Sequence, residues 1–434
     1  MKSKPDRQLI NLVTLGCSKN LVDSEKLLKQ FDANGLQVLH NDDSNRAQTV
    51  IINTCGFIKD AKQESIDTIL QFARAKKQGN LQHLFVMGCL SERYKSALEK
   101  EIPEVDRYFG ANNLFDIVSS LGYNYKENLL GERILSTPSH YAYLKISEGC
   151  DRHCSFCAIP LMRGKHKSRP IPDLLAEAQN LVRMGVKELI LIAQDLSYYG
   201  IDLYRKQKLP ELLFELSNIK ELHWIRLHYA YPSGFPIEIL PIINERENIC
   251  NYLDIPFQHI SNEVLKKMRR GITQQQTYDL IDTLRKSIQN LTLRTTLMVG
   301  HPGEGDQEFE ELMTFIERVR FDRLGVFTYS EEEDTYGARN FKDSVSEKIK
   351  KQRADQIMKL QSEISRDLNQ RKMGIHLNVI IDRKEGDSYI GRTEADSPEV
   401  DNEVIIKSSK DLAIGEFYLA IIAGAEDYDL YAEV

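Results

Sequence analysis

Three cysteines, Cys150, Cys154 and Cys157, have the residue type and spacing that suit metal chemistry. They occur in the segment EGCDRHCSFCAIP, directly after the strand-like run YAYLKIS. Three thiolates can hold three irons of a four-iron cluster and leave the fourth iron open, whereas a purely electron-transferring cluster normally has four protein thiolates. The spacing therefore predicts a reactive iron–sulfur site. A zinc site is the alternative, with His153 as the nearest fourth ligand.

Three further cysteines each end an apolar, strand-like run in the first part of the chain. The runs LINLVTLGC, VIINTC and LFVMGC end at Cys17, Cys55 and Cys89. Helical patterns lie between them, and this alternation predicts a parallel sheet whose carboxyl ends converge on one crevice. A single such cysteine is more often a small buried apolar residue, but three together favour a second site. Cys250, without such companions, is interpreted as a core residue.

The pattern of the remaining residues predicts two further domains. Apolar runs from YAYLKIS to RLGVFTYS alternate with helical patterns, which is typical of a partial (β/α) barrel with its chemistry at the mouth. Ser344 and Glu347 form an S-x-x-E pair that predicts a connector helix ending near Lys372. Short alternating strands near the end predict a small antiparallel β-barrel. We therefore expect an α/β fold with three domains: an N-terminal domain (1–125), a (β/α) barrel (136–373) and a β-barrel (374–434).

Composition limits the classes of function that the chain can have. It has 434 residues, seven cysteines and a formal net charge of -7. No apolar run reaches the roughly 20 residues that cross a bilayer, and the opening segment is too weakly apolar for a secretory signal. We therefore expect a cytoplasmic protein with reduced thiols and no membrane partner. The negative charge disfavours a general nucleic-acid binder.

The spacing C-x-x-x-C-x-x-C after the first barrel strand resembles the signature of radical S-adenosylmethionine (SAM) enzymes. The resemblance implies that the open iron of a [4Fe-4S] cluster binds SAM, which one electron cleaves to a 5'-deoxyadenosyl radical. Such a radical removes hydrogen from unactivated carbon, which no side-chain base can do. By the same resemblance, four residues at strand ends are expected to contact the cofactor: Glu188, Gln194, Arg294 and Gly300.

The cysteine-bearing domain before the barrel resembles the methylthiotransferases of that superfamily. Matching segments run along the whole chain, among them GCSKNLVDSE, NTCGFIKDAKQESID, GCLSERY, YLDIPFQH, MRRG, RTTLMVGHPGE and a closing barrel of the TRAM type. The resemblance implies that Cys17, Cys55 and Cys89 hold a second [4Fe-4S] cluster, whose open iron carries the sulfur to be inserted. It also implies SAM as methyl donor and radical source, and a reductant such as flavodoxin or ferredoxin. The sulfur source stays open.

The flanking residues look most like the RimO-type branch, which methylthiolates the β-carbon of an aspartate in small-subunit ribosomal protein twelve. Charge favours the same interpretation, because residues 375–434 contain fourteen carboxylates against five lysines and arginines. An acidic barrel repels phosphate and suits a basic ribosomal protein as its partner. A merely solubilising surface would explain the same charge.

Two other functions remain open at this point. One is methylthiolation of an adenosine in tRNA by the same chemistry, and the other is a non-catalytic, zinc-bearing adaptor for the ribosome or RNA. The basic segment LMRGKHKSR contains Arg163, Lys165, His166, Lys167 and Arg169. We interpret it as a solvated or anion-binding loop. One of its side chains could pair with the carboxylate of SAM or of the substrate aspartate, since arginine offers bidentate geometry.

Overall fold

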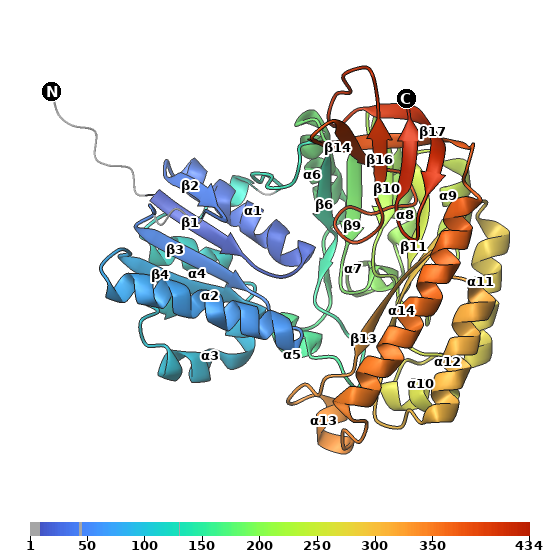
Figure 1. Ribbon diagram of the computed structural model, residues 1–434. Coiled ribbons are helices and arrows are strands. Elements are labelled where there is room, and N and C mark those ends of the chain that lie inside the picture. The colour runs from blue at the N-terminus through green and yellow to red at the C-terminus, as the bar shows by residue number, and fades with distance from the viewer. Residues whose placement is uncertain (1–8, 43–45, 130) are drawn as a thin grey trace. The chain divides into compact units, whose positions relative to one another are not determined.

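The computed structural model describes residues 9–42, 46–129 and 131–434, and these residues form two compact units (Figure 1). The first unit contains the described residues up to 137 together with residues 143–151 and 158–180. The second unit contains residues 138–142, 152–157 and 181–434.

A five-stranded parallel sheet is the framework of the first unit. Its strand order is β2-β1-β3-β4-β5, and every neighbouring pair is parallel. The strands are β1 (Leu9–Thr14), β2 (Gln37–His40), β3 (Thr49–Thr54), β4 (His83–Gly88) and β5 (Arg107–Tyr108). The parallel sheet predicted from the alternation of strands and helices is confirmed.

Helices cover both faces of this sheet (Figure 1). On β3, Val50 and Ile52 join a core with α2 and α3, while Ile51 joins a second core with α1 and α4. Successive strand residues point to opposite faces, so an unbroken apolar run serves both cores. The helices are α1 (Ser18–Ala33), α2 (Lys59–Lys77), α3 (Cys89–Glu101) and α4 (Leu114–Ser120), with a 3-10 turn at Glu127–Leu129.

The segment after Cys157 also belongs to the first unit. Helix α5 (Ile159–Arg163) packs on α3, where Ala158 and Met162 cluster with Cys89. The short strands β7 (Ser147–Glu148) and β8 (Lys167–Ser168) pair antiparallel, and α6 (Ile171–Arg183) follows.

Glu177 on α6 is a fully buried carboxylate among cations. Its Oε2 atom lies 2.7 Å from Nη2 of Arg169, and its Oε1 atom lies 3.6 Å from Nε of Arg133. Burial alone would raise the pKa of Glu177, but Lys26, Arg133 and Arg169 outweigh it and lower the pKa to about 2. The folded first unit therefore favours the ionised carboxylate.

A sheet of six strands is the framework of the second unit, in the order β13-β12-β11-β10-β9-β6, and its neighbouring strands from β9 to β13 are parallel. The strands are β6 (Tyr141–Lys145), whose first two residues belong to this unit, β9 (Glu188–Ile192), β10 (Trp224–Leu227), β11 (Ile249–Asp254), β12 (Thr292–Val299) and β13 (Arg323–Thr328). The partial (β/α) barrel predicted from the sequence is confirmed.

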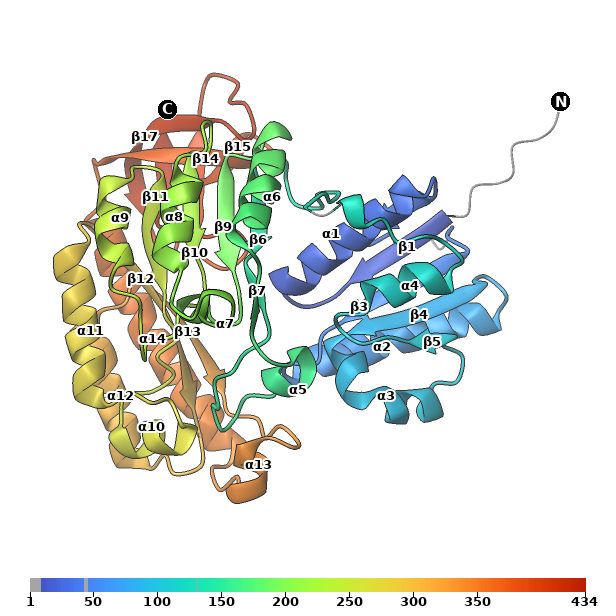
Figure 2. The ribbon, with the colours of Figure 1, turned by 180° about the vertical axis from the view of Figure 1, so that it is seen from behind.

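Helices line one side of this sheet, as Figure 2 shows for α8, α9, α11 and α12. Their bounds are α8 (Leu209–Ser217), α9 (Ile239–Glu245), α11 (Gln274–Ser287) and α12 (Asp306–Val319). Shorter helices lie in the connections: a 3-10 turn at Leu196–Tyr198, α7 (Ile201–Tyr204), α10 (Asn262–Met268) and α13 (Tyr336–Asn340).

The connector helix α14 (Glu347–Gln370) begins two residues later than the sequence predicted. Ser346 is the N-cap, and its hydroxyl accepts a hydrogen bond from the amide of Ile349. The prediction of Ser344 as the cap is wrong, because Glu347 is the first helical residue and not the third, so the two cannot form a capping box. The carboxylate of Glu347 instead stabilises the helix through its favourable interaction with the helix dipole. No helix in the described part of the chain is long and apolar enough to cross a membrane.

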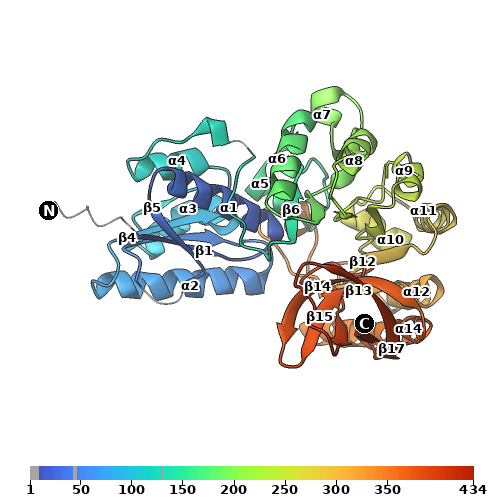
Figure 3. The same ribbon diagram turned by 90° about the horizontal axis from the view of Figure 1, so that it is seen from above.

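The final strands close into a five-stranded barrel in the order β14-β15-β16-β18-β17, seen end-on around the C-terminus in Figure 3. They are β14 (His376–Glu385), β15 (Ser388–Arg392), β16 (Val404–Lys407), β17 (Phe417–Ala425) and β18 (Leu430–Glu433). Four pairs are antiparallel and the pair β16–β18 is parallel. A closed ring with an odd number of strands needs at least one parallel pair, so the predicted barrel is confirmed with this difference.

The barrel packs on the sheet of the second unit through an apolar cluster. Trp224, Cys250 and Tyr252 of the sheet join Ile380 and Phe417 of the barrel, and the rings of Trp224 and Phe417 meet edge to face with centroids 4.8 Å apart. Cys250 is 1% exposed, so its interpretation as a core residue is confirmed.

Replacing Glu177 by glutamine is expected to destabilise the first unit by about 3–5 kcal/mol near neutral pH, because the buried Arg133 and the partly buried Lys26 and Arg169 lose a fully buried carboxylate. The contribution of Glu177 is complete above the ordinary carboxyl pKa and is lost as the pH falls toward about 2. The difference between wild type and Glu177→Gln should therefore narrow below about pH 4.5.

Hydrogen exchange of the β3 amides, measured from pH 7 to pH 3, would follow this difference in stability. Glu64→Gln, on the exposed face of α2, is the matched control and should leave exchange unchanged. A stability difference that stays constant across this pH range would contradict the prediction.

Candidate cysteine sites

Cys17, Cys55 and Cys89 lie at the same end of three adjacent strands. Cys17 is the N-cap of α1 shortly after β1, Cys55 directly follows β3, and Cys89 begins α3 directly after β4. Because β1, β3 and β4 are parallel neighbours, their carboxyl ends meet at one edge of the sheet. The structure thus brings these three predicted residues to a single edge of the first unit.

Glycines make room beside these thiols. Gly16 has a φ of +90°, and a Cβ there would lie 2.9 Å from Sγ of Cys55. Gly88 has a φ of +101°, and a Cβ there would lie 2.5 Å from Oδ1 of Asn53. A side chain at either position would be both strained and in collision. Because Gly16 has no side chain, the side chain of Cys55 can pack directly against the backbone there.

The three thiols also influence one another electrostatically. Burial raises the pKa of Cys55 to about 11, and Cys17 and Cys89 add to the increase. Burial raises the pKa of Cys89 as well, although Arg163 opposes it. Cys17 is exposed while Cys55 and Cys89 are buried, so the group opens to solvent at Cys17. Thiols of this kind become stable thiolates when iron binds them.

Arg163, the last residue of α5, lies against this cysteine group. Its Nε–H donates to Sγ of Cys89 at 3.1 Å, and its Nη1 donates to Asp23 at 2.8 Å and to Glu148 at 3.2 Å. The remaining Nη2 donates to the side-chain oxygen of Asn20. The prediction of a solvated or anion-binding loop is therefore wrong for Arg163, because its guanidinium is buried among residues of the first unit.

Neither cysteine group is arranged as a ready-made metal site. Among the described residues, no three histidine, cysteine or acidic side chains are close enough to chelate an ion as they stand. The donor set itself, three thiols on one sheet edge, is the set that iron–sulfur clusters use. The ligand role of the cysteines stays a prediction.

The second cysteine motif lies on the connection between β7 and α5, and Cys150, Cys154 and Cys157 are all half-buried. Gly149, with a φ of +76°, starts this connection; a Cβ there would lie 2.1 Å from the carbonyl oxygen of Lys165. The amide of Cys150 donates to the carbonyl of Gly164 at 3.1 Å. This close backbone approach fixes the first cysteine of the motif within the first unit.

Cys154 lies among aromatic and cationic side chains of the second unit. Its Sγ atom lies 3.5 Å from the hydroxyl of Tyr231 and accepts a hydrogen bond from Nη1 of Arg270 at 3.4 Å. The Arg270 guanidinium lies 4.1 Å from the centre of the Tyr231 ring, and both residues are buried. The Arg270 guanidinium therefore places a hydrogen-bond donor and a positive charge beside the Cys154 sulfur.

Arg152 and Asp195 extend this cluster. Nε of Arg152 donates to Asp195 at 2.7 Å, and the Arg152 guanidinium also lies 4.1 Å from the centre of the Tyr231 ring. Asp195 follows β9 and accepts a hydrogen bond from the amide of Ser197 at 2.8 Å. Asp195, which follows β9, and Tyr231, which follows β10, thus hold the start of the loop that carries Cys154.

Ser155 anchors the next part of the loop. Its amide donates to the carbonyl of Met268 at 3.0 Å, and its carbonyl accepts from the amide of Gly337 at 2.6 Å. Its hydroxyl lies 3.2 Å from Nε2 of His301, which follows β12. Burial lowers the pKa of His301 to about 4, so the imidazole is neutral at physiological pH and adds no charge near the cysteines.

Glu188 was expected to follow a strand and contact the cofactor, but it is the first residue of β9. Its carboxylate is fully buried, 2.7 Å from Nε of Arg226 and 2.9 Å from Nη1 of Arg392. Arg392 lies in the barrel strand β15, so Glu188 joins the sheet to the barrel at the amino end of β9. The prediction for Glu188 is wrong because two arginines already occupy its carboxylate there.

Arg294 also differs from its prediction, since it lies inside β12 and not at its end. It pairs with Asp254 of β11 at 3.1 Å and with Asp401 of the barrel at 3.2 Å. These partners give it the same kind of structural role as Glu188.

The other two predicted residues do follow their strands. Gln194 lies just after β9, and Gly300 lies just after β12 with its amide donating to Glu304 at 2.9 Å. A Cβ on Gly300 would lie 2.3 Å from Cγ of Lys350, so packing against α14 already requires a glycine there. Cofactor contact by Gln194 and Gly300 stays a prediction.

Sequence reasoning missed the side chains that surround the cysteines. Arg270 belongs to the segment MRRG, which was noted only as part of a resemblance, and Tyr231 ends the run HWIRLHYAY. The position of Asp195 and Tyr231 in the sequence could have identified them, because both follow barrel strands and ligands bind at the ends of such strands. No periodicity of the chain marks Arg163 as a neighbour of Cys89, because residues 89 and 163 meet only through tertiary packing.

Comparison with known proteins agrees with this arrangement. Models of the radical SAM superfamily and of the TRAM domain match residues 144–316 and 373–434, and residues 9–110 match an uncharacterized family, UPF0004. The ribosomal protein uS12 methylthiotransferase RimO of Phocaeicola vulgatus is 54% identical over 429 residues, 99% of each chain. The same-named protein of Cytophaga hutchinsonii is 52% identical over 437 residues, 100% of each chain. This chain belongs to the RimO family.

Membership in this family makes the chain a radical SAM methylthiotransferase, as its resemblance predicted. The cofactors of RimO-type enzymes are two [4Fe-4S] clusters and SAM. In this chain the two groups of three cysteines fit the two clusters in number and in chemistry. The non-catalytic zinc adaptor is therefore set aside.

Solved structures show the same fold at low sequence identity. The radical SAM methyltransferase TsrM from Kitasatospora setae, solved with cobalamin and a [4Fe-4S] cluster, has a TM-score of 0.54 and 15% identity over 74% of this chain and 75% of its own. The cobalamin-dependent SAM radical enzyme OxsB, solved with aqua-cobalamin and SAM, has a TM-score of 0.53 and 14% identity over 77% of this chain and 55% of its own.

Replacing Glu188 by glutamine is expected to destabilise the second unit by about 3–5 kcal/mol, because Arg226 and Arg392 lose their shared carboxylate. The affinity of the reconstituted enzyme for SAM should change little. Trp224, the single tryptophan of the chain, contacts Phe417 of the barrel, so its fluorescence during urea unfolding reports on the sheet and barrel together.

Glu245→Gln, on an exposed position of α9, is the matched control for the loss of a carboxylate. A loss of SAM affinity of about tenfold or more in Glu188→Gln, with unchanged stability, would show that Glu188 binds the cofactor after all.

Proposed function

We propose that this enzyme inserts a methylthio group at the β-carbon of an aspartate in ribosomal protein uS12. The observation that carries the proposal is similarity over the full chain, at 50–55% identity, to enzymes named as uS12 methylthiotransferases. The presence of six cysteines in two groups of three supports the same chemistry, since sulfur insertion needs a sulfur-bearing site as well as a radical source.

We assign Cys150, Cys154 and Cys157 as ligands of the cluster that binds SAM. When bound, the cluster and SAM supply a carbon radical that removes hydrogen from an unactivated C–H bond. The chain's own part is to orient and shield that chemistry. Tyr231 and Arg270 bury one side of Cys154, and Ser155 holds the loop through backbone hydrogen bonds on both sides of its peptide.

We assign Cys17, Cys55 and Cys89 as ligands of the second cluster, which carries the sulfur to be inserted. The position of all three cysteines at one edge of the sheet supports this role, and so does the exposed position of Cys17, which gives a second substrate access to the group.

The acidic barrel supports a basic protein partner, although part of its charge is internal. Three of its carboxylates are turned inward to arginines: Asp382 to Arg392, Asp396 to Arg323 and Asp401 to Arg294. Outside these pairs, residues 375–434 still hold eleven carboxylates against four lysines and arginines. A surface of this charge attracts basic proteins and repels the phosphates of RNA.

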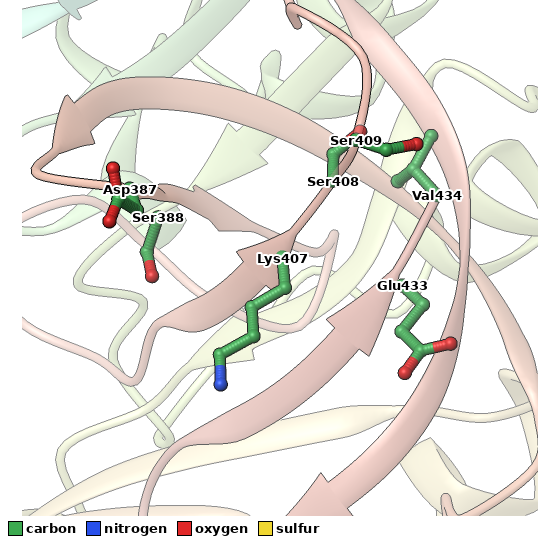
Figure 4. A pocket seen from close by; sticks show the side chains of 7 residues that line it. All are labelled: Asp387, Ser388, Lys407, Ser408, Ser409, Glu433 and Val434. Carbon is green, nitrogen blue, oxygen red and sulfur yellow. The ribbon is translucent and has the colours of Figure 1, made fainter.

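A hollow of about 430 Å³ on this barrel belongs to the acidic surface (Figure 4). Lys407 and Glu433 enter it from the parallel strands β16 and β18, where they are paired in register. Its lining residues are Asp387, Ser388, Lys407, Ser408, Ser409, Glu433 and Val434. Two carboxylates and three hydroxyls against one lysine suit a basic, hydrogen-bonding segment, and we include the hollow in the proposed contact surface.

We further propose flavodoxin or ferredoxin as the electron donor, because SAM cleavage needs one electron from a low-potential carrier. A cytoplasmic location accompanies this proposal, since cysteine ligands of iron–sulfur clusters must be reduced and the cytosol keeps thiols reduced.

Mass spectrometry of uS12 and of tRNA from cells that lack this enzyme tests the substrate. We expect the aspartate of uS12 to lose its methylthio group and the tRNA adenosines to keep theirs. Re-expression of the wild-type enzyme should restore the mark and serves as the control. Loss of the mark from tRNA with an unchanged uS12 would overturn the proposal in favour of tRNA.

Alanine substitution of each cysteine group tests the assignment of the two clusters. Without Cys150, Cys154 and Cys157, deoxyadenosine formation should fall to background; without Cys17, Cys55 and Cys89, it should continue while methylthio transfer stops. Iron analysis should fall from about eight to about four per chain in each variant. Cys250→Ala is the control, because Cys250 belongs to the core.

A further inference from the structure

Arg163 links the cysteine edge of the first unit to the segment that follows the SAM-type motif. It ends α5, which begins just after Cys157 in the chain, and it lies within the first unit beside Cys89. Its side chain is 4% exposed, so water does not compete strongly for its hydrogen bonds.

Each nitrogen of Arg163 has a different partner. Nε donates to Sγ of Cys89 at 3.1 Å, Nη1 donates to the carboxylates of Asp23 and Glu148, and Nη2 donates to Asn20. Asp23 and Glu148 also pair with Lys145, so the two carboxylates are balanced by two buried cations, Lys145 and Arg163. The carboxylates therefore anchor the guanidinium and aim its Nε–H at sulfur.

A merely structural role would account for the contacts with Asp23 and Glu148 but not for the direction of Nε. An ion pair with either carboxylate needs only the outer nitrogens of the guanidinium. The contact of Nε with Cys89 adds a charge-assisted hydrogen bond to a sulfur, and hydrogen bonds to sulfur are among the factors that set the potential of an iron–sulfur cluster.

We propose that Arg163 is a positioning residue for the sulfur-carrying cluster, which donates a hydrogen bond to the Cys89 ligand and raises the reduction potential of that cluster. The proposal rests on the proposed role of Cys17, Cys55 and Cys89 as cluster ligands. A donor and a positive charge both stabilise the more negative, reduced form of the cluster. The segment that carries the SAM-type motif thereby also adjusts the second cluster.

Two substitutions separate the hydrogen bond from the charge. Arg163→Lys keeps a positive charge beside Asp23. The single ammonium nitrogen of lysine cannot replace the two guanidinium nitrogens that donate separately to Asp23 and to Cys89, so the hydrogen bond to Cys89 is lost. Methionine at the same position removes both the cation and the donor. Arg133→Lys is the matched control, because Arg133 is equally buried in the first unit but pairs with Glu25 and Glu177 and not with a cysteine.

The experiment uses the full chain in which Cys150, Cys154 and Cys157 are alanine, so that only the sulfur-carrying cluster is present. After anaerobic reconstitution, the midpoint potential is measured by redox titration with electron paramagnetic resonance. We expect Arg163→Lys to make one-electron reduction about tenfold less favourable, which is about 59 mV, with unchanged iron content. Arg163→Met should lower the potential further, and Arg133→Lys should leave it unchanged.

Electron–nuclear double resonance of the reduced cluster in H2O and D2O gives an independent signature. The wild-type arginine should show an exchangeable proton coupled to the cluster, and Arg163→Lys should lose it. If both position-163 variants bind iron with unchanged potential and proton coupling, the proposal is overturned while the ligand assignment stands. If the parent chain binds no four-iron cluster at all, the ligand assignment fails and this proposal fails with it.

Discussion

The parallel alignment of β1, β3 and β4 is the constraint on which the first cysteine site depends. Neighbouring strands are about 4.8 Å apart, so residues that leave three adjacent strands at the same end lie within about 10 Å across the sheet. Cys17, Cys55 and Cys89 leave at that end. An antiparallel central strand would send one thiol to the opposite edge, and no rotamer change could return it. Gly16 and Gly88 then allow Cys55 and Asn53 to pack closely against the backbone at that edge.

In both units, buried ion pairs between arginine and carboxylate side chains fix the positions of structural elements near the cysteines or at the opposite end of the sheet. In the second unit, Glu188 joins Arg226 to Arg392 and so ties the sheet to the barrel at the end away from the chemistry. In the first unit, Asp23 holds Arg163 against Cys89. These pairs are expensive to desolvate and costly to break, which makes them better at fixing geometry than at adding stability.

The sequence predicted most of this fold because strand and helix alternate regularly and because Cys17, Cys55 and Cys89 each mark the end of a strand. The sequence was a poorer guide to the role of a side chain wherever that side chain contacts residues far away along the chain. Glu188 and Arg294 look like strand-end ligands, but their neighbours Arg392 and Asp401 come from the far end of the chain. Arg163 looks like a member of a basic surface loop until Asp23 is placed beside it. Local patterns report periodicity and caps, whereas such pairs depend on tertiary contacts.

The two units are interleaved along the chain, which crosses between them after residues 137, 142, 151, 157 and 180. A protease that cuts the chain at any one of these crossings would produce two polypeptides that stay together. The two polypeptides stay together because both contribute residues to the core of the same unit. The first unit, for example, needs Glu177 for Arg133 and Arg163 for Asp23. Nicked enzyme should therefore migrate as an intact particle under native conditions. A fragment of residues 1–125 would lack Arg133, Arg163 and Glu177, which are buried in the first unit.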